Sequence, residues 1–318
     1  MKKHSIQIFS LIIFFFLTVS AQKNDRNNNK LQNLFKEWRS FEIPPNENGA
    51  PDYKKITFDK RFPEFLKLKS KLCDIDKSIL STEEEVDWTL IWAEMNGYLF
   101  NYKVLKPWER DPAFYKTIWT SRSDVSAHEG PSHHNLVELW KYKFPLNSQD
   151  KLKLISDLKV IPNLNKQAKQ NLIGNARDLW ITGIRTIKRQ SSDLKSLLKR
   201  IDPLDKGISK VIINAISSTN EFVRWLEKEA INKNGPSGIG KENYTWYQKN
   251  VHLVPLTWEQ EEILLKNELA RAWTSLKYEE KNNSKLPYLS PVNNSKEYDE
   301  LAKKSAEELL SFLDDQRV

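Results

Sequence analysis

The chain has 318 residues, with 50 Lys and Arg against 42 Asp and Glu, and a formal net charge of +8. Its one cysteine, Cys73, excludes an internal disulfide and a zinc cluster built from thiolates. The basic residues are spread among glutamates, whereas a nucleic-acid-binding domain concentrates them on one face. We therefore expect no nucleic-acid partner. Without a disulfide, stability must come from packing, and we expect the eleven Trp and fourteen Phe to supply much of the core.

The amino terminus has the three-part pattern of a secretory signal peptide. Two lysines precede an apolar run at 6–19, and small residues up to Ala21 suit cleavage by a signal peptidase. The run is too short for a comfortable membrane span, and no later segment approaches ~18 consecutive apolar residues. The sequence predicts a signal peptide at 1–21, cut after Ala21, and a secreted or periplasmic mature chain at 22–318 without a membrane partner. An uncleaved anchor is the alternative.

Most segments after the first thirty residues have the apolar periodicity of an α-helix. The helix predicted at 80–102 opens with a capping box, in which Ser81 is followed three residues later by Glu84. The next predicted helix begins at a cap, Ser148, and is expected to stop at Pro162.

Further helices are predicted at 176–201, 256–282 and about 296–314. In the helix at 256–282, we expect Ile263, Leu264 and Leu269 to face inward. Alternation of period two never persists, so we expect under about a tenth of the residues in strands, against the usual 20–25%. The predicted fold is all-α, an irregular multi-helix bundle of about ten helices that forms one helical domain at 22–318.

The stretch SAHEGPSHHNLVELW, at 126–140, resembles a zinc-protease helix at first sight. Such a helix needs two histidines at i and i+4, so that both point at one metal ion. Here His128 and His133 are five residues apart, and a Gly-Pro pair between them breaks any helix. His134 and Glu138 have the right spacing to share a face, which we interpret as a surface hydrogen bond. We expect no metal ligand in this chain.

The stretch GPSGIGK has the glycine spacing of a phosphate-binding P-loop, from Gly235 through Gly240 to Lys241. A P-loop follows a β-strand and carries Ser or Thr after its Lys. Here a charged helix precedes the glycines, and Glu242 would repel phosphates. We therefore expect no nucleotide cofactor. Gly235 is expected to close the preceding helix in a left-handed conformation, and Gly240 to serve the turn before a new helix near Lys241.

That new helix carries a polar stripe at spacings of three and four residues. The stripe consists of Lys241, Tyr244, Gln248 and His252. A cation, a phenol, an amide and an imidazole on one face are able to bind the carboxylate or carbonyls of a peptide, and would then line a substrate cleft. A solvated helix face is the alternative. Trp246 and Leu253 are expected to point into the core.

No complete active site is recognisable from the residues alone. A Gly-x-Ser-x-Gly nucleophile turn is absent, and no His lies near Cys73 in the sequence. Acidic pairs are frequent on the predicted helices, but none has a spacing that marks a catalytic couple. Catalytic residues therefore stay unassigned.

Four stretches of the chain carry a family resemblance: VDWTLIWAEMNGYLFNYKVLKPWERDPAFY (86–115), SDVSAHEGP (123–131), NLIGNARDLWITGIRTIKRQSSDL (171–194) and, most strongly, GPSGIGKENYTWYQKNVHLVPLTWEQEEILLKNELARAW (235–273). Together they resemble the amino-terminal half of the bacterial family catalogued as domain of unknown function 885. The resemblance runs from about Leu34 to Phe312. It implies a secreted or periplasmic relative of helical zinc peptidases, whose zinc signature lies in a carboxy-terminal half to which no position of this chain corresponds.

Two hypotheses follow from this resemblance and from the residues. In the first, the chain is the non-metal half of a zinc-peptidase-like hydrolase and forms one wall of its cleft, inactive alone, with zinc held only by the missing half. Its partners would be a peptide substrate and that missing half. In the second, it is a non-enzymatic secreted helical module for binding or scaffolding.

Overall fold

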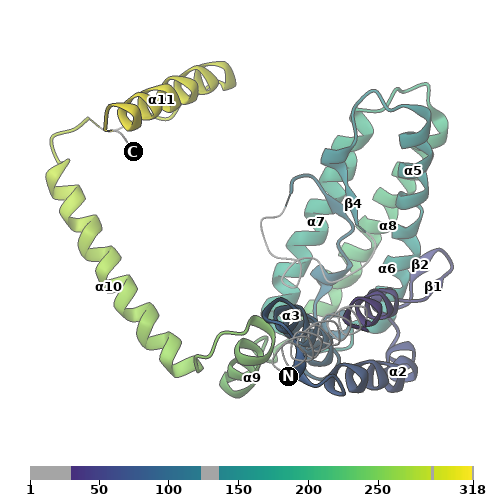
Figure 1. Cartoon of the computed structure of the whole chain (residues 1–318). Helices are drawn as coiled ribbons and strands as arrows, with labels where there is room; N and C mark the ends of the chain where they lie inside the picture. The colour runs from purple at the N-terminus through teal and green to yellow at the C-terminus, as the bar shows by residue number, and fades with distance from the viewer. Residues whose placement is uncertain (1–29, 123–135, 288–289, 317–318) are drawn as a thin grey trace, which may run out of the picture. The chain divides into compact units, whose positions relative to one another are not determined.

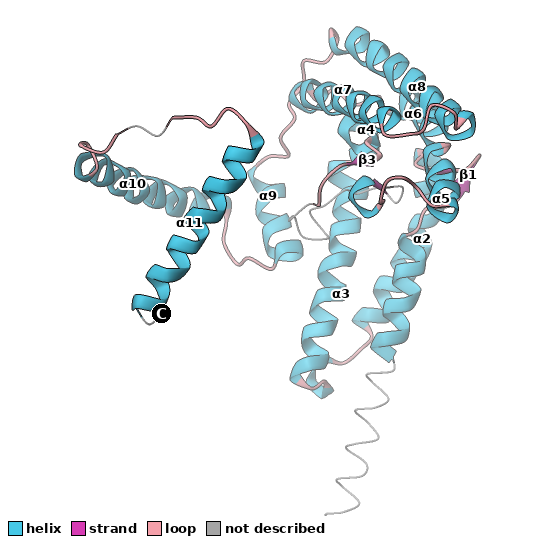
Figure 2. Cartoon of the chain, turned by 90° about the horizontal axis from the view of Figure 1, so that it is seen from above, coloured by secondary structure: helices cyan, strands magenta, loops and turns pink. Residues whose placement is uncertain are grey.

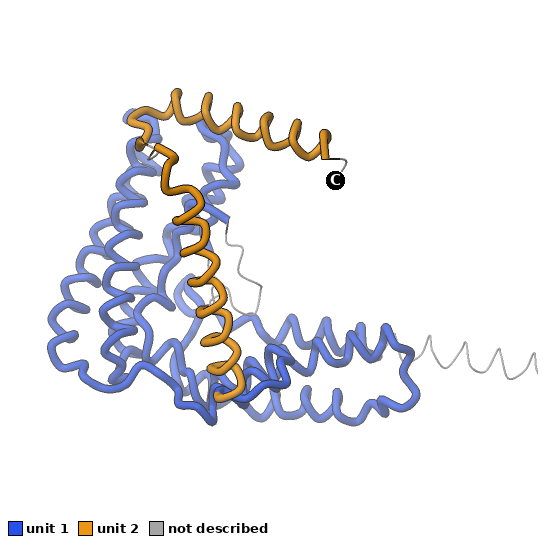
Figure 3. The backbone as a smooth tube through the Cα atoms, turned by 90° about the vertical axis from the view of Figure 1, so that its left-hand side faces the viewer, with its two compact units in different colours: residues 1–258 blue, residues 259–318 orange. Residues whose placement is uncertain are grey.

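The computed structural model describes residues 30–122, 136–287 and 290–316 (Figure 1). The predicted signal peptide lies outside the described residues. The chain divides into two compact units, Met1–Trp258 and Glu259–Val318 (Figure 3), and each is described by itself. Helices dominate both units, which confirms the all-α class predicted from the sequence.

The helices of the first unit account for most of its described residues. They are a segment at 30–42, α2 (Lys55–Cys73), α3 (Thr82–Phe100), α4 (Pro107–Arg110), α5 (Ser148–Leu158), α6 (Val160–Asn171), α7 (Arg177–Lys199), α8 (Lys206–Ala230) and α9 (Lys241–Tyr247). Short turns of 3₁₀ helix occur at η1 (Lys77–Ile79), η3 (Pro112–Tyr115) and η4 (Leu139–Lys141). Two π-helical turns, η2 (Asn101–Leu105) and η5 (Gln248–His252), continue α3 and α9.

Among the described residues, strands are limited to four of two residues each. β1 (Asn46–Glu47) pairs antiparallel with β2 (Ala50–Pro51), with Asn46 opposite Pro51. β3 (Ile118–Trp119) pairs parallel with β4 (Val137–Glu138), with Ile118 opposite Val137. This part of the chain therefore agrees with the expected low strand content.

Local signals set the start of α3 as predicted, whereas both ends of the helix predicted at 148–162 differ. At α3, the Glu84 N–H donates to Ser81 Oγ at 3.3 Å and the Ser81 N–H donates to Glu84 Oε2 at 2.8 Å, which is the expected capping box. At α5, the cap is Asn147 rather than Ser148, because Asn147 Oδ1 accepts from the N–H of the third helical residue at 2.8 Å. Pro162 does not stop this helix. It lies in the first turn of α6, where the missing N–H has no helical partner to lose.

Two hydrophobic clusters lie along the α7–α8 pair, which Figure 1 shows side by side with α5 and α6. One contains Trp180 and Phe222 and gathers side chains from α6, α7, α8 and η3. The other contains Leu194 and Ile212 and adds residues of α5, β3 and β4. Fully burying an apolar side chain of this size contributes about 1.5–3 kcal/mol, so these clusters hold the four-helix part together.

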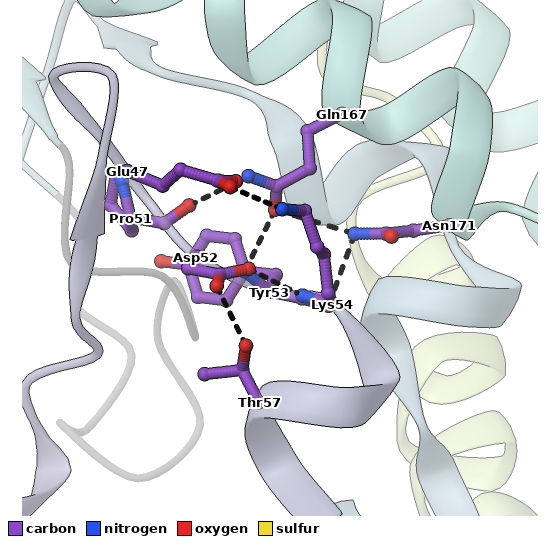
Figure 4. Close-up of polar contacts among 8 residues, drawn as sticks. All are labelled: Glu47, Pro51, Asp52, Tyr53, Lys54, Thr57, Gln167 and Asn171. Atoms are coloured by element: carbon purple, nitrogen blue, oxygen red, sulfur yellow. Dashed lines mark hydrogen bonds and ion pairs between the residues drawn. The ribbon is translucent and has the colours of Figure 1, made fainter.

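A network of amide side chains ties the segment after the β1–β2 hairpin to α6 (Figure 4). Gln167 Oε1 accepts from the Tyr53 N–H at 2.7 Å, and Gln167 Nε2 donates to the Pro51 carbonyl at 3.0 Å. Asn171 Nδ2 donates to the Tyr53 carbonyl at 3.0 Å and to the Tyr115 hydroxyl at 3.1 Å. These side chains bond to backbone groups of Pro51 and Tyr53, because buried polar groups require hydrogen-bond partners.

A third cluster joins the segment at 30–42 to α2 and α3, which lie side by side in Figure 2. Its centre is aromatic: Trp38 and Phe65 are fully buried, and the ring of Tyr98 meets that of Trp38 edge-on at 5.7 Å. The Tyr98 hydroxyl is buried, and no other described residue hydrogen-bonds to it. This burial raises the pKa of Tyr98 to about 12.

We expect Tyr98→Phe to make the protein more resistant to alkali. An unfolded tyrosine ionises near pH ~10, whereas folded Tyr98 holds its proton to about 12, so Tyr98 lowers the free energy of unfolding as pH rises between these values. Urea unfolding measures the free energy of unfolding of both proteins. Near neutral pH the variant should be as stable as wild type or more stable, and near pH ~11 its advantage should be larger. If both proteins lose the same free energy of unfolding as the pH rises, this explanation is ruled out.

The second unit consists of most of α10 (Trp258–Asn282) together with α11 (Ser295–Gln316), and no described residue of either helix is buried. Both helices match their predicted ranges. The expectation that Ile263, Leu264 and Leu269 face inward is wrong, because these side chains are 61%, 50% and 68% exposed. An apolar stripe is buried only where another element packs on it, and periodicity does not show whether one does.

Candidate functional site

The predicted polar face lies on α9 and on the π-helical turn η5 that continues it. Gly240 precedes α9 with φ of 82°, a conformation that glycine adopts at no steric cost, as expected. Leu253 ends η5 with φ of 60°, and its N–H donates to the Gln248 carbonyl. A left-handed leucine is strained, and both such strain and π-helical turns are frequent at functional sites. The local backbone therefore marks this segment independently of its side chains.

Apolar contacts hold α9 and η5 against α3. Val251 is 5% exposed and lies over Gly97, where an added Cβ would be 3.5 Å from Val251 Cγ1. Phe100, near the end of α3, meets the ring of Trp246 at 5.5 Å and that of Tyr247 at 4.8 Å. The position of the polar face is thus fixed by the opposite, apolar side of the same short helix.

Two side chains of this helix differ from their expected positions. Trp246 is 36% exposed and Leu253 is 40% exposed, so neither points into the core. Stacking on Phe100 covers only one face of the Trp246 indole, and Leu253 ends the π-helical turn in a left-handed conformation. Val251 takes the buried position instead.

A polar contact adds to this packing from inside α3. Asn96 is 1% exposed, and its Nδ2 donates to the Asn250 carbonyl at 3.1 Å. On its other side, Asn96 Oδ1 accepts from Lys69 Nζ, whose pKa is lowered by burial. A carbonyl within the π-helical turn therefore has a donor from α3, which helps to hold that irregular backbone in place.

The structure brings together three of the four predicted site residues, Tyr244, Gln248 and His252. Gln248 Nε2 donates to the Tyr244 hydroxyl at 2.7 Å, and Gln248 Oε1 lies 3.0 Å from His252 Nδ1. The ring of Tyr247 meets the His252 ring edge-on, with centroids 4.8 Å apart. All three side chains are half-buried, and the Nε2 atom of His252 is buried. They form one continuous hydrogen-bonded row.

The fourth predicted residue, Lys241, is exposed and lies over another ring. Its Nζ is 3.5 Å from the centroid of Trp258, a cation–π contact worth about 0.5–1 kcal/mol at an exposed site. The Trp258 N–H donates to Thr245 Oγ1 at 3.0 Å, so α9 also fixes the first residue of α10. Lys241 thus contacts this indole, and it lies three residues before Tyr244 on α9.

The glycine-rich loop before α9 supplies a cap for a distant helix. Ala176, at the start of α7, has no capping side chain of its own. Ser237 Oγ accepts from the N–H groups of Asp178 at 2.8 Å and Leu179 at 3.2 Å. A serine therefore satisfies two of the free donors of α7 from about sixty residues further along the chain.

The same loop is closed against the turn that precedes α7. Asn175 Oδ1 accepts from the N–H groups of Asn234 and Gly235, each at 2.8 Å, and the Arg177 N–H donates to the Gly235 carbonyl at 3.0 Å. The predicted left-handed conformation of Gly235 is wrong: Gly49 and Gly240 are the glycines of the described chain with positive φ. Gly235 is required because its Cα lies against Asn175, where a Cβ would be 2.4 Å from the carbonyl oxygen.

Arg110, at the end of α4, connects the glycine loop to the π-helical turn η2. Its Nη2 donates to the Ser237 carbonyl at 3.0 Å and to the Pro236 carbonyl at 3.4 Å, and its Nη1 donates to the Leu105 carbonyl at 3.4 Å. A helix, α8, precedes this loop where a P-loop has a strand. The loop therefore connects α8 to α9, as its glycines predicted.

No metal centre is assigned within the described residues, because no three or more His, Cys, Asp or Glu side chains there are grouped to hold a metal ion. His128, His133 and His134 lie outside the described residues. Glu138, the expected partner of His134, forms an ion pair with Lys141.

Several residues that position the site were not found from the sequence. Asn96, Arg110, Asn175 and Ser237 each bond to backbone groups between 58 and 154 residues away. Contacts between residues so far apart produce no local pattern in the sequence from which they could be predicted. The one usable signal was Ser237, a hydroxyl that follows Pro in a glycine-rich turn, where a capping role is common.

Comparison with known proteins adds one structural likeness. No family model and no curated protein matches the chain. Among solved structures, the chain is similar to one described as "a putative lipoprotein of unknown function from Shewanella oneidensis", with a TM-score of 0.54 and 16% identity. The match covers 94% of this chain and 58% of that one. At this identity the likeness shows the fold alone, and the chain spans little more than half the length of that protein.

A search of the described residues finds no helix with the length and apolar content needed to span a membrane.

Proposed function

We propose that this protein is the amino-terminal helical half of a peptidase-like hydrolase that works outside the cytoplasm. In this proposal the half binds a peptide and does not cleave it, because a further segment carries the metal. The observation that carries the proposal is the row Tyr244–Gln248–His252, which begins on α9 and continues onto a strained π-helical turn that carries Gln248 and His252. The family resemblance and the lipoprotein description of the solved structure support an extracytoplasmic location.

The second unit supports the presence of a further segment. Leu265, Leu269, Trp273 and Leu276 form one face of α10 and are 67%, 68%, 58% and 48% exposed. A helix gains most of its stability in a protein from packing its apolar face, and α10 and α11 bury none of their described residues. The match covers 58% of the solved structure's chain, so that protein has chain outside the matched part.

The chemistry of the row suits binding. A tyrosine hydroxyl donates to a carbonyl or carboxylate oxygen, and Lys241 at the edge adds a positive charge. Hydrolysis by a metal-bound water needs a metal site, and the described residues contain no group of three or more His, Cys, Asp or Glu side chains able to hold a metal ion. The proposal therefore assigns recognition to this chain and bond cleavage to the further segment.

We expect Tyr244→Phe and His252→Ala each to weaken peptide binding by the mature chain about 5- to 30-fold, the effect of one to two kcal/mol. Calorimetric titration with short peptides measures this, and melting temperatures should stay within a few degrees because both side chains are half-buried. Tyr278→Phe, on an exposed tyrosine of α10, is the matched control and should change neither quantity.

Two outcomes would count against the proposal. Unchanged binding with a melting temperature several degrees lower would make the row structural. Binding without hydrolysis in a gene product extended past Val318 would favour the alternative, a non-enzymatic binding module. Reading the gene downstream of Val318 for a helical stretch with His-Glu residues is the simplest first step.

A further inference from the structure

One backbone carbonyl of the π-helical turn η5, that of Asn250, is bonded from outside its own helix. Within a helical turn this carbonyl would accept from an N–H about three to five residues further on. The N–H groups of Leu253 and Val254 both donate to the Gln248 carbonyl instead. The next residue, Pro255, has no N–H. The Asn250 carbonyl therefore needs a donor from another element.

Helix α3 supplies this donor. Asn96 Nδ2 donates to the Asn250 carbonyl at 3.1 Å, and the next residue of α3, Gly97, lies against Val251. Two successive residues of α3 thus contact two successive residues of η5. Asn96 is 1% exposed, so its amide depends on protein partners for its hydrogen bonds while η5 is packed on α3.

The amide of Asn96 has one favourable orientation, and Lys69 on α2 determines it. Lys69 Nζ donates to Asn96 Oδ1. An ammonium group donates and has no acceptor, whereas a backbone carbonyl only accepts. A reversed amide would therefore place donor against donor at Lys69 and acceptor against acceptor at Asn250. The bond from Lys69 thus directs the amide nitrogen toward the turn.

Lys69 is a half-buried side chain without a carboxylate partner among the described residues. The titratable groups that act on it are Cys73, one turn further along α2, and Lys103 on η2. Two lysines near each other, one of them half-buried, are unfavourable for their positive charges. The bond to Asn96 Oδ1 is what Lys69 gains in this position, which points to a role for that bond.

We propose that Lys69 is a positioning residue for the polar face on η5 and acts on that face through Asn96. With the turn closed, Asn96 Oδ1 is buried and requires the N–H of Lys69. When the turn opens, water reaches Asn96. Lys69 therefore stabilises the closed turn, which carries Gln248 and His252. The coupling from Lys69 to η5 stands without the proposed function, whereas its importance for peptide recognition rests on it.

Residue-resolved amide hydrogen exchange in the mature chain tests the coupling, since the N–H groups of Leu253 and Val254 close the turn and exchange when it opens. We expect Lys69→Met to speed the exchange of both amides about fivefold or more, because a buried acceptor is left unsatisfied in the closed turn only. Lys67→Met, on an exposed lysine of the same helix, is the matched control and should leave both rates unchanged.

Two further measurements separate this role from a general loss of stability. The Asp205 N–H closes the turn between α7 and α8 by donating to the Asp202 carbonyl at 2.9 Å, and its exchange should be the same in Lys69→Met as in wild type. In an Asn96→Leu background, Lys69→Met should cause no further acceleration at the two amides that close η5. Unchanged rates at these amides in Lys69→Met, or the same acceleration with and without Asn96, overturn the proposal.

Trialanine, which carries peptide carbonyls and a free carboxylate, tests the link to peptide recognition. A ligand that requires the closed turn makes opening less frequent, so trialanine at about ten times its calorimetric Kd should slow the exchange of both η5 amides about tenfold. If trialanine does not bind, or binds and leaves these rates unchanged, the link to peptide recognition is overturned and the proposed function is weakened. Faster exchange in Lys69→Met would still support the coupling from Lys69 to η5.

Discussion

Replacing Gly235 by alanine is expected to lower the free energy of unfolding by about 3 kcal/mol, at the upper end of typical overpacking costs. The added Cβ would lie 2.4 Å from the Asn175 carbonyl oxygen and 2.9 Å from its Cγ. A backbone oxygen cannot swing aside, so the two chain segments must separate. Separation also weakens the bonds that Asn175 Oδ1 receives from Asn234 and Gly235, each worth about 0.5–1.5 kcal/mol.

The same loop provides a matched control for this substitution. At Gly238, nothing lies within 4 Å of the position of an added Cβ, and the backbone is not left-handed. Gly238→Ala should therefore be neutral, or more stable by about 0.4–1 kcal/mol through the unfolded chain. Urea unfolding followed by circular dichroism compares the two variants. Equal stabilities would show that the loop relaxes freely and does not fix the start of α9.

Local sequence signals predicted the elements that local interactions form. The capping box at Ser81, the range of α7 and the start of α9 at Lys241 all depend on residues within a few positions of one another. Gly240 was recognisable for the same reason, since a backbone position with positive φ favours glycine wherever it occurs. The order of polar residues along the site helix also followed from spacing alone.

Contacts between segments far apart in the chain could not be predicted from the sequence. Gly235 looked like a helix-closing glycine, but its role is the close approach to Asn175, sixty residues away. The apolar stripe of α10 was correctly seen as a stripe, yet Ile263 and Leu264 are exposed. Periodicity shows which face of a helix is apolar. Which element packs on that face depends on the tertiary structure, and this could not be predicted from a single sequence.

The largest stabilising role of a single polar side chain is expected at Gln190, in the middle of α7. Gln190 is fully buried, and its Oε1 accepts from the N–H groups of Thr117 at 2.6 Å and Ile118 at 3.1 Å. Both donors belong to the short stretch that leads into β3, and both residues are themselves 0% exposed. One amide oxygen thus accepts from two backbone N–H groups of residues that are shielded from solvent.

Gln190→Leu should therefore cost about 2–5 kcal/mol, because it leaves two buried N–H groups unsatisfied at about 1–3 kcal/mol each. Part of this cost is offset, since the Gln190 Nε2 is buried without a partner among the described residues and the variant removes it. Gln170→Leu, on an exposed glutamine of α6, is the control and should change stability by less than about 0.5 kcal/mol. Calorimetric or urea unfolding of both variants measures the difference.

A second variant separates the lost acceptor from altered packing. Gln190→Glu keeps an accepting oxygen at nearly the same volume, but its ionised form places a charge in the apolar core beside Leu194. Protonation at low pH removes that charge and leaves the acceptor, so Gln190→Glu should regain stability relative to Gln190→Leu as pH falls from about 7 to about 4. If the two variants instead keep a constant difference over this range, packing of the side chain, and not its two hydrogen bonds, stabilises the junction between α7 and β3.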